Sequence, residues 1–296
     1  MRRLVLFPGA LGDLCMLASV LAVRAARDER IVLCVRRALA PAVGMLLPAA
    51  EIGPPMDGAA MSALFGATVD AELEQYLRAA DRVDAWLARS DHDGSLSRRL
   101  AALEVPFALH EVPRTDALHH ASLDYAEALG VAPLGAAARA VAPVPSGPLP
   151  WRRAGARRLV LHPGAGAPGK VWELEGFRRV AAAWEAAGGE VVVLLGPAED
   201  PQAWAWRAAG RSCVRNATLG DAAALIASAP YWLGNDSGMS HLAGALDRAG
   251  VVVFTATRAA RWRPLGGRLA AIDAAGRALD VVVRQVRADL EAVAAS

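Results

Sequence analysis

The sequence predicts an α/β protein built from two Rossmann-like, doubly wound domains. Residues 2–9, RRLVLFPG, join a short apolar run to a turn, and helical periodicity follows over residues 13–27. Residues 157–164, RRLVLHPG, repeat this start almost letter for letter in the second half of the chain. The intervening residues 132–150 are rich in Pro, Ala and Gly, which is typical of a linker. Two halves that each begin with a strand and a helix favour two open parallel sheets.

Hydrophobic periodicity supplies the other expected elements. Strands are predicted at 3–8, 31–35, 157–164, 190–196, 231–236 and 251–257, and helices at 13–27, 36–47, 71–90, 119–129, 174–187, 201–209, 221–228 and 279–294, with a short helix from Ser237. The domain boundary is expected within the linker, which gives an N-terminal domain of 1–145 and a C-terminal domain of 146–296. For the final helix, 279–294, packing against the N-terminal domain is also considered.

Composition narrows the class of protein. The chain has 296 residues and a formal net charge of +2, so a general attraction to nucleic acid is not expected. Pro8, Gly9, Gly12 and Asp13 interrupt the longest apolar stretch, which argues against a membrane span. A signal peptide is not expected, because no small-residue cleavage site follows a clean apolar core. The three cysteines lie far apart in the sequence, which argues against a metal cluster and fits a reduced, cytoplasmic protein.

The first loop whose residues could take part in catalysis or binding is PGALGD, residues 8–13. Asp13 stands where a helix begins, so it could act as an N-cap that stabilises the helix by about 1 kcal/mol. The same carboxylate could instead face an interdomain cleft as a general base. A dinucleotide-binding loop is a third possibility, but that motif requires G-x-G-x-x-G and this loop has only G-x-x-G. The residues alone leave the first two possibilities open.

The second loop, HPGAGAPGKVW at 162–172, nearly matches a phosphate-binding Walker A loop. Val171 stands where that motif requires Ser or Thr to hold magnesium, and helical periodicity begins only near Leu174. Lys170 is the only lysine among 32 basic residues, which hints that a compact ammonium group is needed there. Backbone N–H groups, one cation and a nearby helix start still predict an anion site.

The third loop is GNDSGMSHLAGA, residues 234–245. Asp236 and Ser237 are favourable helix caps, and the N–H groups of residues 237–239 could bind a phosphate at the helix N-terminus. His241 falls one turn into this helix, on the face of Ser237 or Gly238. The alternative is a capped helix with an incidental histidine. A fourth loop, 254–266, carries three arginines around Trp262 and is either an anion-facing rim or a solvated basic loop.

Taken together, these loops resemble those of the ADP-heptose:lipopolysaccharide heptosyltransferases. The resemblance is carried by LGD at 11–13, HPGAG…K.W at 162–172, GP.E at 196–199, GNDSG..HLA at 234–243 and F.AT…RW.PLG at 254–266, with a weaker echo at 120–130. This family consists of inverting glycosyltransferases of the GT-B architecture, in which two Rossmann-like domains face each other across a cleft. The resemblance implies that the N-terminal domain binds the acceptor and that the C-terminal domain binds the donor.

The resemblance also implies a role for each matching residue. Asp13 matches the base that deprotonates the acceptor hydroxyl, and Lys170 matches the lysine that neutralises the donor diphosphate. The other donor-binding positions that it implies are Gly166, Glu199, Asp236, Ser237, Gly238 and His241, with Glu199 near the donor ribose, and Gly12 is assigned to the acceptor side. No metal is expected, which fits the absence of Ser or Thr after Lys170. No cofactor is expected either, because the nucleotide sugar is itself a substrate.

The implied reaction is transfer of heptose from ADP-heptose to a hydroxyl group of a glycan or glycolipid. Nucleic acid is not an expected partner, and association with the inner membrane surface is left open. Two other functions remain: a degenerate family member that binds a nucleotide or glycan without catalysis, and a nucleotide-sugar epimerase. The chain departs from the family at Glu173, where Pro is common, and at Thr255, where Gly is usual. Its short N-terminal domain suggests an acceptor other than lipopolysaccharide core.

Overall fold

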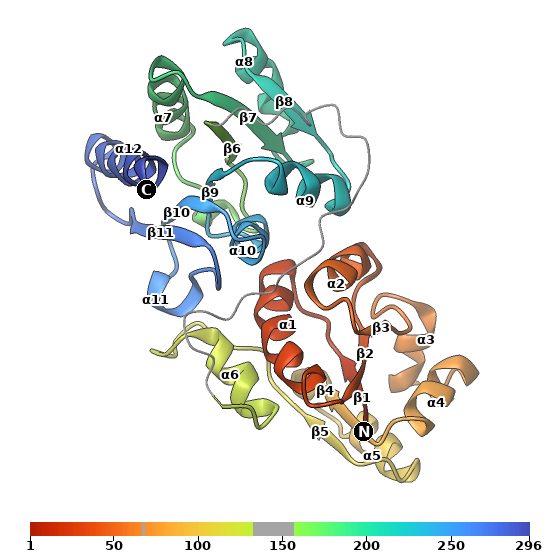
Figure 1. The fold of residues 1–296 in the computed structure, drawn as a ribbon. Coiled ribbons are helices and arrows are strands. Elements are labelled where there is room, and N and C mark those ends of the chain that lie inside the picture. The colour runs from red at the N-terminus through yellow and green to blue at the C-terminus, as the bar shows by residue number, and fades with distance from the viewer. Residues whose placement is uncertain (67–68, 133–156) are drawn as a thin grey trace. The chain divides into compact units, whose positions relative to one another are not determined.

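The computed structural model describes residues 1–66, 69–132 and 157–296, which form two compact units (Figure 1). Of the described residues, 1–114 and 121–132 belong to the first unit, and 115–120 and 157–296 belong to the second. The segment 115–120 therefore comes from the N-terminal half of the sequence but packs with the C-terminal half. The predicted domain boundary at 145/146 lies outside the described residues, as does the predicted linker beyond Ala132.

The first unit contains a five-stranded parallel sheet. Its strands are β1 (Arg2–Leu6), β2 (Arg30–Cys34), β3 (Glu51–Ile52), β4 (Arg82–Ala85) and β5 (Phe107–Leu109), in the order β3-β2-β1-β4-β5. Its helices are α1 (Leu11–Ala25), α2 (Ala40–Leu46), α3 (Ala59–Ser62), α4 (Ala71–Arg78), α5 (Ser95–Ala102) and α6 (Ala121–Ala128), with short 3₁₀ turns η1 (Arg37–Leu39), η2 (Ala63–Phe65) and η3 (Ala88–Ser90). Helices α3, α4 and α5 pack in one apolar cluster with the strands, and α1 packs with α2 and α6.

The second unit contains a six-stranded parallel sheet. Its strands are β6 (Arg158–His162), β7 (Glu190–Leu195), β8 (Ser212–Arg215), β9 (Tyr231–Asn235), β10 (Ala249–Phe254) and β11 (Arg268–Asp273), in the order β11-β10-β9-β6-β7-β8. Its helices are α7 (Leu174–Ala186), α8 (Ala203–Ala208), α9 (Leu219–Ala227), α10 (Gly238–Ala245), α11 (Ala259–Trp262) and α12 (Leu279–Ala295), with 3₁₀ turns η4 (Pro168–Lys170) and η5 (Asp200–Gln202). Helices α7, α8 and α12 share one apolar cluster with the sheet, and α10 packs against α9 and β9.

Both sheets reverse their strand order at one point, which is where open α/β sheets commonly bind ligands. The first reverses between β1 and β4, and the second between β6 and β9. At such a point the loops that leave the two neighbouring strands diverge, which opens a crevice beyond their carboxyl ends. The sequence motifs PGALGD, HPGAGAPGKVW and GNDSG follow β1, β6 and β9, respectively, and therefore lie at these two positions.

The predicted helix over 71–90 is wrong in its second half. Helix α4 ends at Arg78, and β4 occupies Arg82–Ala85. Val83 and Asp84 lie on an interior strand of the sheet, between β1 and β5, and are both fully buried. A strand buried on both faces lacks the alternation of apolar and polar residues that marks a half-exposed strand, so periodicity alone cannot separate it from a helix.

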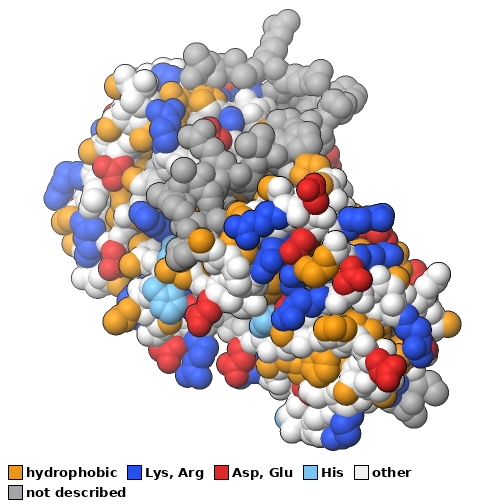
Figure 2. All heavy atoms as spheres, turned by 60° about the horizontal axis from the view of Figure 1, so that its bottom comes forward, with side chains coloured by type: hydrophobic (Ala, Val, Ile, Leu, Met, Phe, Trp, Pro, Cys, Tyr) orange, Lys and Arg blue, Asp and Glu red, His pale blue; other side chains and the backbone are white. Residues whose placement is uncertain are grey.

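The surface agrees with the small net charge. On the face shown in Figure 2, arginine and acidic side chains are interspersed. Among the described residues, none of the helices combines the length and the apolar character that crossing a bilayer requires.

A buried carboxylate joins three strands of the first sheet. Asp84 is fully buried and is bound by Arg3, by Arg82 at 3.3 Å and by Nε2 of His110 at 2.8 Å. Burial alone would raise the pKa of Asp84. The hydrogen bond from His110 and the charges of the two arginines outweigh it and hold the pKa below its ordinary value.

We predict that Asp84→Ala destabilises the protein by about 3–5 kcal/mol, because the substitution leaves the buried Arg3 guanidinium without this partner. Urea denaturation measures the change in unfolding free energy. The matched control is Glu74→Ala, which breaks an exposed pair with Arg78 and should change stability by less than about 1 kcal/mol. Since the folded-state pKa of Asp84 is lowered, its contribution is present above pH ~4 and is lost as the pH falls through the folded-state pKa. Equal effects of the two substitutions would contradict the prediction.

Candidate functional site

A buried asparagine holds the glycine-rich loop that follows β6. Nδ2 of Asn235 donates to the carbonyl oxygens of Pro163 at 2.7 Å and Gly164 at 3.3 Å. Its Oδ1 accepts from the backbone N–H of Trp172 at 3.0 Å, at the other end of the loop. Trp172 is buried and packs edge-on against Phe177 of α7, with ring centroids 5.0 Å apart. Both ends of the loop are therefore fixed to the sheet and the core.

The lysine of this loop meets the end of β9. Nζ of Lys170 lies 2.8 Å from Oδ2 of Asp236, and Thr257 Oγ1 donates to the same oxygen at 2.6 Å. Thr255 Oγ1 donates to the carbonyl oxygen of Gly169 at 2.9 Å. The two threonines after β10 thus hold the carboxylate and the loop that carries the lysine. Lys170 keeps about a third of its side chain exposed (33%), whereas Asp236 is buried (5%).

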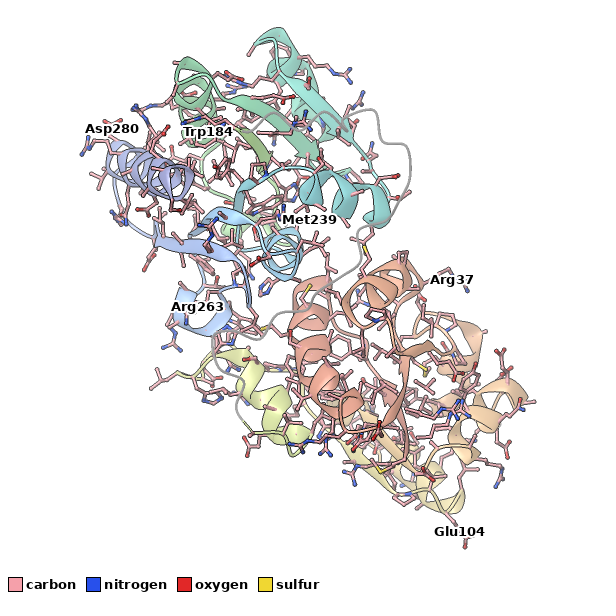
Figure 3. All side chains as sticks on the ribbon, viewed as in Figure 1. Arg37, Glu104, Trp184, Met239, Arg263 and Asp280 are labelled. Atoms are coloured by element: carbon pink, nitrogen blue, oxygen red, sulfur yellow. The ribbon has the colours of Figure 1, made fainter. Side chains whose placement is uncertain are left out.

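Helix α10 begins beside this ion pair. Ser237 is its N-cap, and the Ser237 hydroxyl accepts from the N–H of Ser240 at 3.4 Å. Ser240 is itself fixed, because its hydroxyl donates to the Asn235 carbonyl at 2.6 Å and accepts from Trp232 Nε1 at 3.0 Å. Met239, labelled in Figure 3, lies in the first turn of α10. The N–H groups of a first helical turn point out of the helix end, and the helix dipole makes that end favourable for an anion. The predicted N-cap at Ser237 is confirmed.

His241 lies one turn into α10, as the sequence predicts, but it is buried (4% exposed). Within the described part of the chain, its Nδ1 is buried and has no hydrogen-bond partner. The pKa of His241 is lowered to about 4, mainly by burial; the charge of Asp236 opposes the shift, and the charges of His120 and Lys170 add to it. The imidazole is therefore neutral at physiological pH.

The glycines of the loop fall into two kinds. A Cβ on Gly164 would lie 2.5 Å from Cδ of Glu199, so the buried Glu199 carboxylate requires glycine there. Oε2 of Glu199 also accepts from the N–H of Gly196 at 3.1 Å. At Gly166 and Gly169, by contrast, a Cβ would meet nothing within 4 Å. Internal packing therefore does not explain why these two positions are glycine. The open space beside them could accommodate a ligand.

Two arginines of the fourth loop donate hydrogen bonds to backbone carbonyl oxygens of the segment 115–120. Arg258 donates to the carbonyl oxygens of Asp116 and Ala117 at 2.9 and 3.1 Å, and the buried Arg261 donates to that of His119 at 2.9 Å. Nε2 of His120 lies 2.8 Å from the carbonyl oxygen of Arg263, which Figure 3 labels near α11. The predicted alternatives, an anion-facing rim and a solvated loop, both miss this role, because the segment that Arg258 and Arg261 bind comes from the other half of the chain.

In the first unit, Asp13 is not a helix cap. Helix α1 begins at Leu11, with Ala10 as its N-cap, so Gly12 and Asp13 lie inside the first turn. The helix starts two residues earlier than predicted, and the N-cap interpretation of Asp13 is wrong. Oδ1 of Asp13 accepts from Oη of Tyr125 on α6 at 3.1 Å. Asp13 is half-buried, and Tyr125 is fully buried.

Comparison with known proteins identifies the family. Residues 75–288 match glycosyltransferase family 9 (heptosyltransferase), which is more than half of the chain. The chain belongs to this family. The resemblance predicted from the loops is thereby confirmed, and the protein is a glycosyltransferase. The matched range contains every predicted donor residue but not the loop that carries Gly12 and Asp13.

Solved structures of family 9 proteins have the same fold. E. coli heptosyltransferase WaaC with ADP is 20% identical, with 99% of both chains covered and a TM-score of 0.71. E. coli ADP-heptose lipopolysaccharide heptosyltransferase II is 18% identical, with 99% of both chains covered and a TM-score of 0.73. A family 9 glycosyltransferase from Veillonella parvula is 16% identical over 99% of this chain and 97% of that chain, with a TM-score of 0.74. No curated protein sequence matches the chain. The predicted α/β fold with two Rossmann-like domains is confirmed.

Sequence reasoning missed three polar side chains at these sites. Asn235 was visible in GNDSG, but nothing marked its side chain as the clamp of a loop about 70 residues earlier. The position of Thr257 just after a predicted strand could have marked it as a candidate, because ligands bind beyond strand ends in such sheets. Tyr125 had only the weak echo at 120–130. Among the described residues, no group of three or more His, Cys, Asp or Glu side chains is placed to hold a metal ion.

We predict that His241 titrates near pH 4, because burial disfavours its charged form. NMR of ring-labelled protein measures the titration, and His241→Gln assigns the signal. Unfolded histidine binds a proton near pH 6.5, so native stability should fall as the pH drops from ~6.5 to ~4. The His241→Gln variant should lack this part of the pH dependence. A midpoint near 6.5 in the native protein would refute the assignment.

Proposed function

We propose that this protein is an inverting, metal-independent glycosyltransferase that moves heptose from ADP-heptose to a hydroxyl group of a glycan or glycolipid. The observation that carries the proposal is the Lys170–Asp236 pair beside the N-terminus of α10, in a chain that belongs to family 9. Relatives with this fold have been solved with ADP and with ADP-2-deoxy-2-fluoro heptose. A nucleotide diphosphate is the ligand that a lysine and a helix N-terminus together would recognise.

The donor diphosphate would lie over the glycine-rich loop. Gly166 and Gly169 leave room for it, and Lys170 and the first turn of α10 supply positive charge and N–H donors. Ser237 and Gly238 would contact the phosphate or the sugar, with Glu199 toward the ribose. His241, neutral and buried, would add no charge of its own. Val171 fits this arrangement, because the lysine and the helix dipole, rather than a magnesium ligand, stabilise the leaving group.

Asp13 would act as the general base. It removes the proton from the acceptor hydroxyl, and the resulting oxygen attacks the anomeric carbon from the face opposite the diphosphate. As the new carbon–oxygen bond forms, the bond to the diphosphate oxygen breaks and ADP leaves with its electron pair. One displacement of this kind inverts the anomeric configuration. Gly12, in the same turn as Asp13, belongs to the acceptor side of the proposal.

The acceptor is defined here only by class. The reaction would take place in the cytoplasm, and a glycolipid acceptor would place it at the inner membrane surface. Catalysis is favoured over non-catalytic binding because Asp13 and Lys170 are both present and both have defined partners. The decisive test is ADP release from ADP-heptose in the presence of a panel of glycan and glycolipid acceptors, followed by anomeric analysis of the product.

Lys170→Ala should weaken ADP binding by at least about tenfold, because it removes a charge-assisted contact to the diphosphate. Isothermal titration calorimetry with ADP measures the dissociation constant, with UDP and GDP testing the choice of base. Lys170→Arg should lose less, since it keeps the charge. Arg179→Ala, which removes a cation paired with Asp280 on the surface of the same unit, is the control and should bind ADP normally. Unchanged affinity in Lys170→Ala would sink the phosphate role.

Asp13→Asn should lower kcat about 10²- to 10⁴-fold while leaving ADP affinity unchanged, because the amide keeps the shape but cannot accept the proton. Steady-state transfer assays and calorimetry with ADP measure the two effects. Glu72→Gln, at an exposed position in the first turn of α4, is the matched control. Transfer at the wild-type rate in Asp13→Asn would show that another group is the base.

A further inference from the structure

We infer that Tyr125 is a positioning residue that holds the Asp13 carboxylate in one orientation for catalysis. This inference rests on the proposed function, in which Asp13 is the base. Oη of Tyr125 donates to Oδ1 of Asp13 at 3.1 Å, across 112 positions of sequence. The terminal torsion of an aspartate is broad and roughly two-fold, so an exposed carboxylate can rotate. A donor fixed on one oxygen restricts that rotation and aims the proton-accepting lone pairs in one direction.

The hydroxyl of Tyr125 can do this because its ring is held on several sides. The ring is fully buried and lies edge-on to Phe7, with centroids 6.0 Å apart, and it is tilted against Trp86 at 5.7 Å. Phe7 follows β1 and packs edge-on against Trp86 at 5.8 Å. Two aromatic side chains, from the residues that directly follow β1 and β4, thus hold the Tyr125 ring.

The same aromatic group connects Tyr125 to the loop that carries Asp13. A Cβ on Gly9 would lie 2.2 Å from Cζ of Phe7, so the turn passes directly against the Phe7 ring. Phe7 therefore contacts both the PGALGD turn and Tyr125. A shift of the ring would move the turn and the hydroxyl donor together, which keeps the Tyr125–Asp13 hydrogen bond in register.

Helices α1 and α6 are also joined by a hydrogen bond near their C-terminal ends. Arg24, in the last turn of α1, donates to the carbonyl oxygen of Leu129, just after α6, and pairs with Glu29 at 2.9 Å. Helix α6 is therefore attached to α1 near the start of α1, through Asp13, and near its end, through Arg24. This two-point attachment sets the depth at which the Tyr125 hydroxyl meets the Asp13 carboxylate.

Tyr125→Phe tests the inference, because it removes one oxygen and keeps the aromatic packing. We expect kcat for transfer to fall about tenfold, because a misdirected base slows the proton transfer, while the KM for donor and the Kd for ADP stay within about twofold. A general structural role would lower stability or binding as well. The thermal unfolding midpoint is therefore measured alongside, and a change of only a few degrees is expected.

Two further variants separate the possible failures. Tyr76→Phe removes a hydroxyl that interacts with the Glu51 carboxylate in the same unit, and it should leave kcat unchanged. In an Asp13→Asn background, Tyr125→Phe should have no further effect on kcat, because the two residues act through one group. Full activity of Asp13→Asn would overturn the base assignment. Loss of activity in Asp13→Asn but an unchanged kcat in Tyr125→Phe, or an additive loss in the double variant, would overturn only the role of Tyr125.

Discussion

The second unit depends on one buried amide, the side chain of Asn235. Its Nδ2 and Oδ1 bind both ends of the glycine-rich loop, from Pro163 to Trp172, and the backbone carbonyl oxygen of Asn235 accepts from the Ser240 hydroxyl of α10. A buried amide that makes all of these bonds specifies one loop conformation, because any other would leave buried polar groups without partners. The reversal of strand order between β6 and β9 makes this possible, since it places Asn235 beside the strand that the loop leaves.

The same five-residue sequence, RRLVL, forms the first strand region of both units, but the residues that follow it make different contacts. RRLVL is followed by Phe7 in the first unit and by His162 in the second. The Phe7 ring packs between Gly9 and Tyr125, while Nδ1 of His162 lies 2.9 Å from the carbonyl oxygen of Leu194. Each following loop needs a glycine, but one glycine faces an aromatic ring and the other, Gly164, faces a carboxylate. The repeated start therefore predicts the shared fold but not the chemistry of the two loops.

This contrast separates what the sequence could predict from what it could not. Elements with clear periodicity were predicted closely: α7 ends one residue before its predicted end, and β7 one residue before its own. The start of α1 was misplaced, because neither Ala10 nor Leu11 carries a capping side chain. In the loops that are predicted to bind the donor, Lys170 and Asp236 lie together. The partners that fix them, such as Asn235 and Tyr125, join distant positions, and a single sequence carries no local sign of such pairing.

The single lysine of this arginine-rich chain, Lys170, forms an ion pair with Asp236. A diphosphate that binds at this site would compete with Asp236 for the ammonium group. When Lys170 binds the diphosphate instead, the Asp236 carboxylate would keep a hydrogen bond, because Thr257 still donates to the same oxygen. Lysine suits such an exchange, since its compact ammonium has three rotatable donors on a flexible stem, whereas the planar fork of arginine favours one fixed bidentate geometry. A third of the Lys170 side chain is already exposed (33%), so the exchange requires no opening of the core.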